Sequence, residues 1–123
     1  MKKVLVIDDC ECIADLIQEA LCQEGYLVDV AVDGKEGLTK YFEGEYDLVI
    51  TDMKMPGCNG LAVSERIKRS NRPTLLIGIS GTPWIAPEKS FDAVIQKPFS
   101  LYTLFDHVQR LAGKDNNELA VTA

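Results

Sequence analysis

The sequence predicts a single α/β domain of the doubly wound type, with five parallel strands in the order 2-1-3-4-5. Short apolar, β-branched runs alternate with amphipathic segments, as expected when a helix follows each strand of a parallel sheet. The runs are almost continuously apolar, which is typical of strands buried on both faces. The length of 123 residues suits one domain with one core.

The five strands are predicted from apolar runs that polar or turn residues bound. They are expected at residues 3–8, 27–32, 47–52, 74–79 and 92–96. Helices are expected at 11–24, 34–43, 59–70 and 100–112. Gly25 stands just past the first helix, a position that glycine favours. Asn59 and Ser100 precede the last two helices, where we expect their side chains to act as caps.

The segment between the fourth and fifth strands departs from the pattern. Residues 81–90 leave room for roughly two helical turns, and Pro87 would disrupt a helix interior. We therefore expect a short or irregular fourth helix. The domain is expected to span residues 1–112, and the polar tail at 113–123 is expected to be disordered.

Composition and charge exclude several classes of protein. The net charge of −6 and the pI near 4.7 argue against direct nucleic-acid binding, which a basic surface supports. No apolar run approaches the ~20 residues of a membrane span, and the first strand is too short for a signal-peptide core. We expect a cytoplasmic protein with no membrane partner. The four cysteines lack zinc-site spacing and are expected to be reduced thiols.

Aspartates end or follow two of the predicted strands. Asp8 and Asp9 follow the first strand's apolar run, and Asp52 ends the third. In the predicted order these strands are neighbours, so the three carboxylates meet at the carboxyl edge, beside the point where the winding reverses. Ionised carboxylates that crowd together repel each other, and a hard cation such as Mg²⁺ relieves the repulsion. The alternative is that Asp8 or Asp9 caps the first helix. Capping does not explain Asp52.

Two more polar residues are predicted at the same edge. Ser80 ends the fourth strand and Lys97 ends the fifth. With the carboxylates they offer a cation site, a nucleophile, a hydroxyl donor and an ammonium group. This set suits phosphoryl transfer, in which a carboxylate can accept the phosphoryl group as an acyl phosphate.

At these motifs the sequence resembles a receiver domain of the two-component response-regulator family, which implies a CheY-like, flavodoxin-like fold. The resemblance extends over roughly residues 2–112. It rests on motifs at the strand ends, namely Asp8-Asp9, the run from Tyr46 to Asp52 with Met55-Pro56 and Gly60, Ser80-Gly81, and Lys97-Pro98-Phe99.

The resemblance implies a role for each site residue. Asp52 would be the phosphoacceptor, and Asp9 and Asp52 would bind Mg²⁺ directly, together with the backbone carbonyl of Lys54. Asp8 would act largely through water. Lys97 would contact the phosphoryl oxygens before a cis peptide bond to Pro98.

The resemblance also implies a switch. Ser80 would hydrogen-bond the phosphate, with help from the backbone N–H of Gly81. The phosphodonor would be a sensor histidine kinase or a phosphotransfer protein, and the output would pass to an unknown downstream protein. The chain would be a phosphoacceptor that catalyses its own phosphorylation and slow dephosphorylation, not a turnover enzyme. We expect a monomer or a weak dimer, either stand-alone or part of a longer regulator.

The sequence departs from the family at two places. Receivers usually carry an aromatic residue three positions before the lysine, where this chain has Val94. Many family members dimerise or signal through the face formed by the fourth helix, the fifth strand and the fifth helix. The shortened fourth unit of this chain puts that face in doubt. We therefore expect docking at the first helix, where Ala14, Ile17 and Gln18 are candidates, and near Pro98-Phe99-Ser100. For Ile17 the alternative is a place in the core.

Three alternative functions remain open from the sequence. A haloacid-dehalogenase-type phosphatase uses similar groups, but its signature Asp-x-Asp is absent from the first strand. An FMN binder needs a phosphate-cradling first loop, and Asp8-Asp9-Cys10-Glu11 would repel a phosphate. The third alternative is a receiver fold that binds a partner without phosphorylation.

Overall fold

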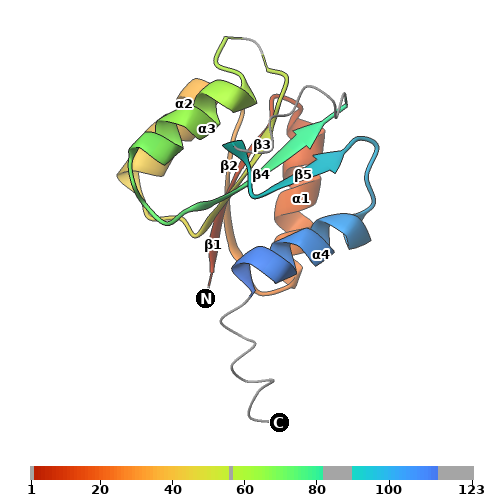
Figure 1. Cartoon of the computed structure of the whole chain (residues 1–123). Helices are drawn as coiled ribbons and strands as arrows, with labels where there is room; N and C mark the ends of the chain where they lie inside the picture. Colours follow the sequence, from red (N-terminus) through yellow and green to blue (C-terminus); the bar gives the residue numbers. More distant parts are fainter. Residues whose placement is uncertain (1, 56, 82–89, 114–123) are drawn as a thin grey trace, which may run out of the picture.

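The protein forms a five-stranded parallel sheet in the order β2-β1-β3-β4-β5, as predicted (Figure 1). This computed structural model describes residues 2–55, 57–81 and 90–113. The strands are β1 (Lys3–Ile7), β2 (Leu27–Ala31), β3 (Leu48–Asp52), β4 (Leu75–Ser80) and β5 (Ala93–Gln96).

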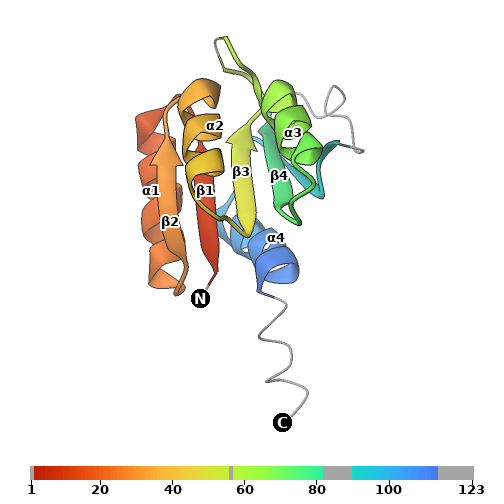
Figure 2. The same ribbon diagram turned by 90° about the vertical axis from the view of Figure 1, so that its left-hand side faces the viewer.

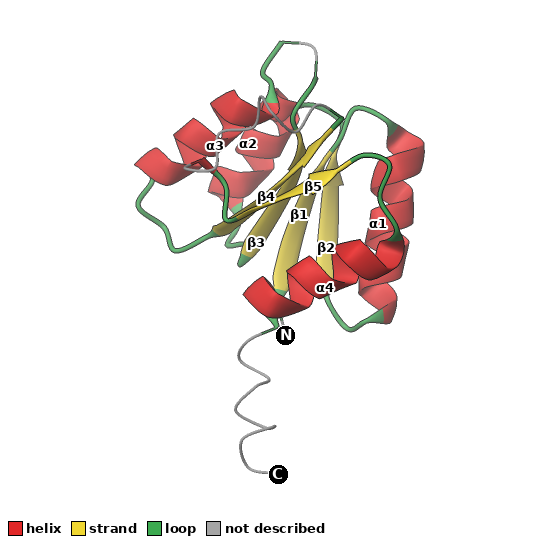
Figure 3. Ribbon diagram, turned by 45° about the vertical axis from the view of Figure 1, so that its right-hand side comes forward, coloured by secondary structure: helices red, strands yellow, loops and turns green. Residues whose placement is uncertain are grey.

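Helices cover both faces of the sheet, α1 and α4 on one face and α2 and α3 on the other (Figures 2 and 3). Their bounds are α1 (Glu11–Gln23), α2 (Gly34–Glu43), α3 (Gly60–Arg69) and α4 (Leu101–Ala112). Each predicted boundary is within one residue of the observed one. The predicted irregular fourth helix and the predicted tail lie mostly outside the described residues.

The buried side chains form two clusters because successive residues of a strand point to opposite faces. In β1, Val4 and Val6 pack with α1 and α4, whereas Leu5 and Ile7 pack with α2 and α3. All four are at most 1% exposed. Burial of each such side chain stabilises the fold by about 1.5–3 kcal/mol. The sheet is therefore the rigid central layer on which the site is built.

The predicted helix signals are confirmed where the structure describes them. The Asn59 side chain accepts a hydrogen bond from the Ala62 N–H at 2.9 Å, and Ser100 accepts one from the Thr103 N–H at 3.1 Å. Gly25 has φ +95° just after α1, in the left-handed region where glycine carries no steric penalty. These local signals explain why the helix boundaries could be predicted closely.

The strand register brings distant polar residues to one edge of the sheet. Ile7 pairs with Thr51, so Asp8 and Asp52 follow at neighbouring positions. Asp52 pairs with Ile79 in β4, one residue before Ser80, and Ser80 pairs with Gln96 in β5. Across the described ranges, the structure contains no helix long and apolar enough to cross a membrane.

Candidate functional site

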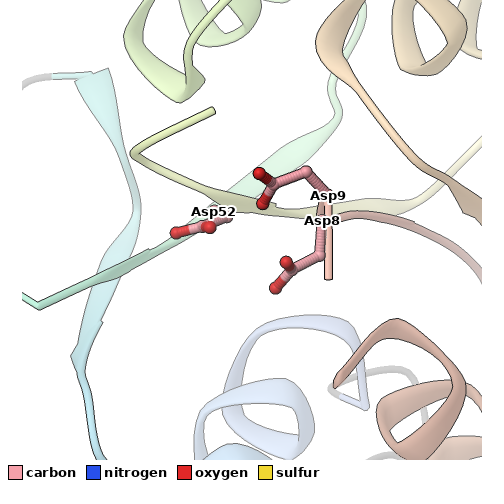
Figure 4. Close-up of side chains that lie close together, drawn as sticks. All are labelled: Asp8, Asp9 and Asp52. Carbon is pink, nitrogen blue, oxygen red and sulfur yellow. The ribbon is translucent and has the colours of Figure 1, made fainter. Parts of the chain in front are cut away.

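Three aspartates meet at the carboxyl edge of the sheet. One carboxylate oxygen from each of Asp8, Asp9 and Asp52 lies within 4.8 Å of the others, and Figure 4 shows the three side chains together. Asp8 is 1% exposed and Asp52 is 5% exposed, whereas Asp9 faces solvent. The site therefore joins two buried carboxylates to one that is accessible.

Asp8 is only half satisfied in its buried position. Its Oδ1 accepts a hydrogen bond from the Cys10 N–H at 2.9 Å. Its Oδ2 is buried and has no hydrogen-bond partner among the described residues. Burial raises the pKa of Asp8 above its ordinary value, and the nearby Asp52 raises it further, while the Cys10 N–H and Lys97 act against this shift.

Capping does not explain why Asp8 occupies this position. Cys10 is the residue that precedes the first turn of α1, and it makes no side-chain capping bond. Asp8 bonds the N–H of Cys10 itself and does not bond the N–H groups of the first helical turn. Asp8 therefore bonds the residue before the helix and not the first helical turn, and its Oδ2 has no hydrogen-bond partner among the described residues.

The single cation within ion-pair distance of these acids, in the described part of the chain, is Lys97. Its Nζ lies 3.3 Å from Asp52 Oδ1, and its side chain is 31% exposed. The Lys97 N–H donates to the Ser80 carbonyl at 2.7 Å, which places the lysine at the end of β5. The Lys97-Pro98 peptide bond is cis, as expected. One ammonium group therefore faces three carboxylates.

Ser80 and Lys54 lie on the strands and loop around Asp52. Ser80 is the last residue of β4 and is 2% exposed. Lys54 follows β3 by two residues and its side chain is exposed. Gly81, directly after Ser80, is exposed. The metal role of the Lys54 carbonyl and the phosphate contacts of Ser80 and Gly81 remain predictions.

Gly60 supports the position of Asp52 by close backbone packing. A Cβ at this residue would lie 2.5 Å from the Asp52 carbonyl oxygen and 2.8 Å from Met53 Cα. The Gly60 N–H donates to the Met53 carbonyl at 3.1 Å, and the Met53 N–H donates to the Ile79 carbonyl at 2.9 Å. The sequence included Gly60 in its motif, but only the structure shows that the start of α3 rests on Asp52.

Two expectations about signalling residues change with the structure. Ala14 is 2% exposed and Ile17 is 0% exposed, so neither can contact a partner. Gln18 is half-buried and its side-chain amide donates to the Val28 carbonyl at 2.9 Å. The docking prediction is wrong for Ala14, and for Ile17 the core alternative is confirmed, because both occupy the apolar stripe of α1 that faces the sheet.

Val94 lies among packed core side chains. Val94 is half-buried against the cluster that contains Leu76 and Phe91, and Phe91 is 6% exposed. The ring of Phe91 packs close to Gly78. Phe91 therefore belongs to the core.

The donor set at this edge fits a hard divalent cation. Carboxylate oxygens are ligands that Mg²⁺ prefers, and it usually binds one or two of them while keeping several waters. The Asp8 Oδ2, which no described residue bonds, and the exposed Asp9 carboxylate offer such oxygens beside Asp52. Chemically, the site combines a cation position, a buried nucleophilic carboxylate and a fixed ammonium group.

The chain is similar to known signalling proteins. It is 32% identical over 117 residues to the transcriptional regulatory protein DltR of Streptococcus agalactiae, covering 87% of this chain and 50% of that protein. It is 32% identical over 115 residues to the transcriptional regulatory protein TcrA of Mycobacterium tuberculosis, covering 89% of this chain and 46% of that protein. This chain thus spans about half the length of the curated relatives it matches.

Solved structures agree in fold. The response regulator TrrA of Thermotoga maritima, crystallised in complex with Mg²⁺-BeF, is 36% identical with a TM-score of 0.83. That match covers 90% of this chain and 99% of TrrA. TrrA has also been solved in complex with the histidine kinase ThkA, with a TM-score of 0.81 to this chain and coverage of 90% and 98%. Residues 4–109 match the response regulator receiver domain family, and the chain therefore belongs to this family of two-component signalling domains.

Proposed function

We propose that Asp52 accepts a phosphoryl group from a phosphohistidine in a Mg²⁺-dependent reaction, and that this receiver thereby switches the binding of a partner. The observation that carries the proposal is the buried Asp52 carboxylate, 3.3 Å from Lys97 and next to two further acids. Its support from related proteins is the Mg²⁺-BeF complex and the histidine-kinase complex of TrrA.

In the proposed reaction, a carboxylate oxygen of Asp52 attacks phosphorus, an acyl phosphate bond forms and the phosphorus–nitrogen bond breaks. The leaving imidazole keeps the electron pair of that bond. Lys97, already fixed beside Asp52, is proposed to neutralise charge on the transferred group, and positioning plus charge neutralisation accounts for most of the catalysis of such transfers. The receiver thus catalyses its own phosphorylation.

The three aspartates are proposed to have different roles at the metal site. Asp9, Asp52 and the Lys54 carbonyl would hold Mg²⁺, and Asp8 would act through a bound water. When bound, Mg²⁺ supplies positive charge that offsets the repulsion between the carboxylates and the incoming phosphoryl group. The buried Asp8 carboxylate would then gain the hydrogen-bond partner that its Oδ2 lacks among the described residues.

Phosphorylation is proposed to act through Ser80 and the loop that begins at Gly81. The phosphoryl group adds about −1.5 to −2 charge at neutral pH and three acceptor oxygens. The Ser80 hydroxyl and the Gly81 N–H are the proposed donors. Their movement toward the phosphate would shift the packing between two states that a partner protein or an attached domain distinguishes.

The test is intact mass spectrometry of the protein after incubation with acetyl phosphate and Mg²⁺. We expect a gain of one phosphoryl group. The control variant is Asp52→Asn, which keeps the shape of the side chain, and the control condition is excess chelator. Both should abolish the gain, while circular dichroism confirms that the variant is folded.

Each other outcome assigns a different function. No gain in the folded wild-type protein would overturn the proposal and favour a receiver fold that binds its partner without phosphorylation. A gain that persists in Asp52→Asn would place the phosphoacceptor elsewhere. Rapid turnover of a generic phosphate ester would revive the phosphatase alternative.

A further inference from the structure

A patch of arginines and one exposed aromatic ring lies at the ends of α2 and α3, which pack side by side on one face of the sheet (Figure 2). The patch consists of Phe42, near the end of α2, with Arg66 and Arg69 of α3 and Arg72 just after it. Phe42 is 40% exposed although it is large and apolar. We call this surface the arginine–Phe42 patch.

The Phe42 ring is held in place although it faces solvent. The guanidinium carbon of Arg66 lies 5.9 Å from the ring centroid, and that of Arg72 lies 5.4 Å from it. The Tyr41 ring meets it edge to face at 5.1 Å. Arg72 is itself anchored, because it donates to the carbonyls of Tyr41 and Gly44 at 3.2 Å each. The ring is therefore ordered before any partner binds.

The charge of the patch is not neutralised within the described part of the protein. Arg66 and Arg69 are exposed and three residues apart, which puts them on the same helix face. Neither makes an ion pair with a described carboxylate, although Glu43 and Glu65 are near in sequence. Both arginines lie in the last turn of α3, where positive charge interacts favourably with the helix dipole. Here they stand on a chain whose net charge is −6.

We propose that the arginine–Phe42 patch docks an acidic segment of a partner protein, with carboxylates on either side of an apolar side chain. Guanidinium groups bind carboxylates bidentately, and arginine and aromatic residues are enriched among the residues that dominate binding energy at interfaces. The apolar side chain would cover Phe42 while the carboxylates pair with Arg66 and Arg69.

The net charge of the chain favours a protein segment over a nucleic acid as the partner of this patch. A nucleic acid presents a long row of phosphates that would extend beyond three arginines, and the net charge of −6 on the chain would repel it. A short acidic segment fits within the patch. Gly60, at the start of α3, packs on Asp52, and the patch lies toward the other end of the helix, with Arg66 about 9 Å and Arg69 about 14 Å along its axis from Gly60. The surface is thus separate from the proposed phosphorylation site.

The test is an NMR titration of the ¹⁵N-labelled full chain, unphosphorylated, with the peptide acetyl-Glu-Glu-Leu-Glu-Glu-amide. We expect saturable shifts confined to the ends of α2 and α3, which weaken at high salt. The double variant Arg66→Gln/Arg69→Gln should bind at least roughly 5-fold more weakly. Phe42→Ala should also weaken binding, because the ring loses its contact with the leucine.

The matched control is Arg110→Gln, an exposed arginine of α4 that pairs with Asp106 at 3.4 Å. It removes one positive charge, half of what the double variant removes, and should leave binding unchanged. Equal binding by the double variant, shifts outside the patch, or equal binding of the Gln-substituted peptide would overturn the proposal. So would tighter binding of a thymidine oligonucleotide of the same charge. Because the protein is unphosphorylated, failure of the phosphorylation test would leave this result unaffected.

Discussion

Polar groups are arranged in opposite ways at the amino edge and the carboxyl edge of the sheet. At the amino edge, where strands begin, the Tyr46 hydroxyl donates to Asp29 at 2.6 Å and the Lys3 N–H donates to Asp47 at 2.9 Å. At the carboxyl edge, Asp8, Asp9 and Asp52 face a single described cation, Lys97. One edge pairs its charges and the other concentrates them.

This contrast separates the polar groups that stabilise the fold from those that form the candidate site. Paired polar groups at the amino edge stabilise the folded chain modestly, each hydrogen bond by about 1 kcal/mol. Crowded carboxylates at the carboxyl edge lower stability, because burial and mutual repulsion disfavour their charged forms. Such conflict between local stability and structure is expected at functional sites. The variants below compare the two edges.

The largest expected effect is that of Lys97→Ala on phosphorylation by acetyl phosphate. We expect the rate to fall about 100-fold, because a fixed charge beside the transferred group is lost. The initial rate is followed by intact mass. Lys3→Ala, which removes a lysine 4.0 Å from Asp29 at the amino edge, should phosphorylate normally. An equal effect of both variants would erase the functional difference between the edges.

The second prediction concerns stability at the carboxyl edge. Asp8→Asn should raise the free energy of unfolding by about 1 kcal/mol at neutral pH without Mg²⁺, because a buried charge is removed. Chemical denaturation measures it. The matched change at the amino edge, Asp29→Asn, should slightly destabilise the protein, because the attraction to Lys3 is lost. A destabilised Asp8→Asn would contradict the assignment.

The stabilisation expected of Asp8→Asn depends on pH, and the pKa of Asp8 gives the sign of that dependence. The pKa of Asp8 is raised on folding from its ordinary value of 3.8, so the folded state takes up this proton more readily. Protonation of Asp8 therefore favours the folded state at acidic pH. This contribution of Asp8 to stability is lost as the pH rises through its raised pKa. The gain from Asp8→Asn should be present above the raised pKa and should vanish below 3.8. A gain that is independent of pH would exclude the Asp8 charge as its cause.

A smaller effect is expected at the amino edge from Tyr46→Phe. The variant removes the hydroxyl that bonds Asp29 and should lower the free energy of unfolding by about 1 kcal/mol. Water can replace the lost bond, since the Asp29 side chain is 48% exposed, and this limits the loss. Phosphorylation should proceed at the wild-type rate. A slowed phosphorylation would mean that the two edges are coupled.

The smallest expected effect is that of Lys54→Ala. The lysine side chain is exposed two residues after Asp52, where it can screen or orient the water that attacks the acyl phosphate. We expect the lifetime of the phosphorylated protein to change while phosphorylation itself continues. Decay of the phosphorylated mass after donor removal measures the lifetime, and an unchanged decay would refute this role.

Much of the architecture was predictable because the signals that define it are local. Apolar runs, Asn59, Ser100 and Gly25 identify strands, caps and turns without reference to the rest of the chain. The strand order then follows from the general rule for doubly wound sheets, and it brings Asp8 beside Asp52. The docking prediction failed for Ala14, because exposure depends on which side of α1 faces the sheet.

The elements, their order and the residue types at the carboxyl edge could be predicted from the sequence, since periodicity and turn chemistry act over a few residues. The tertiary structure was needed to show that Asp8 Oδ2 lacks a described partner, that Gly60 rests on Asp52, and that two guanidinium groups lie 5.9 Å and 5.4 Å from the centre of the Phe42 ring. Those properties arise where helix, strand and loop from distant parts of the chain meet. Whether a charge is paired depends on what packs against it, which spacing along a chain does not encode.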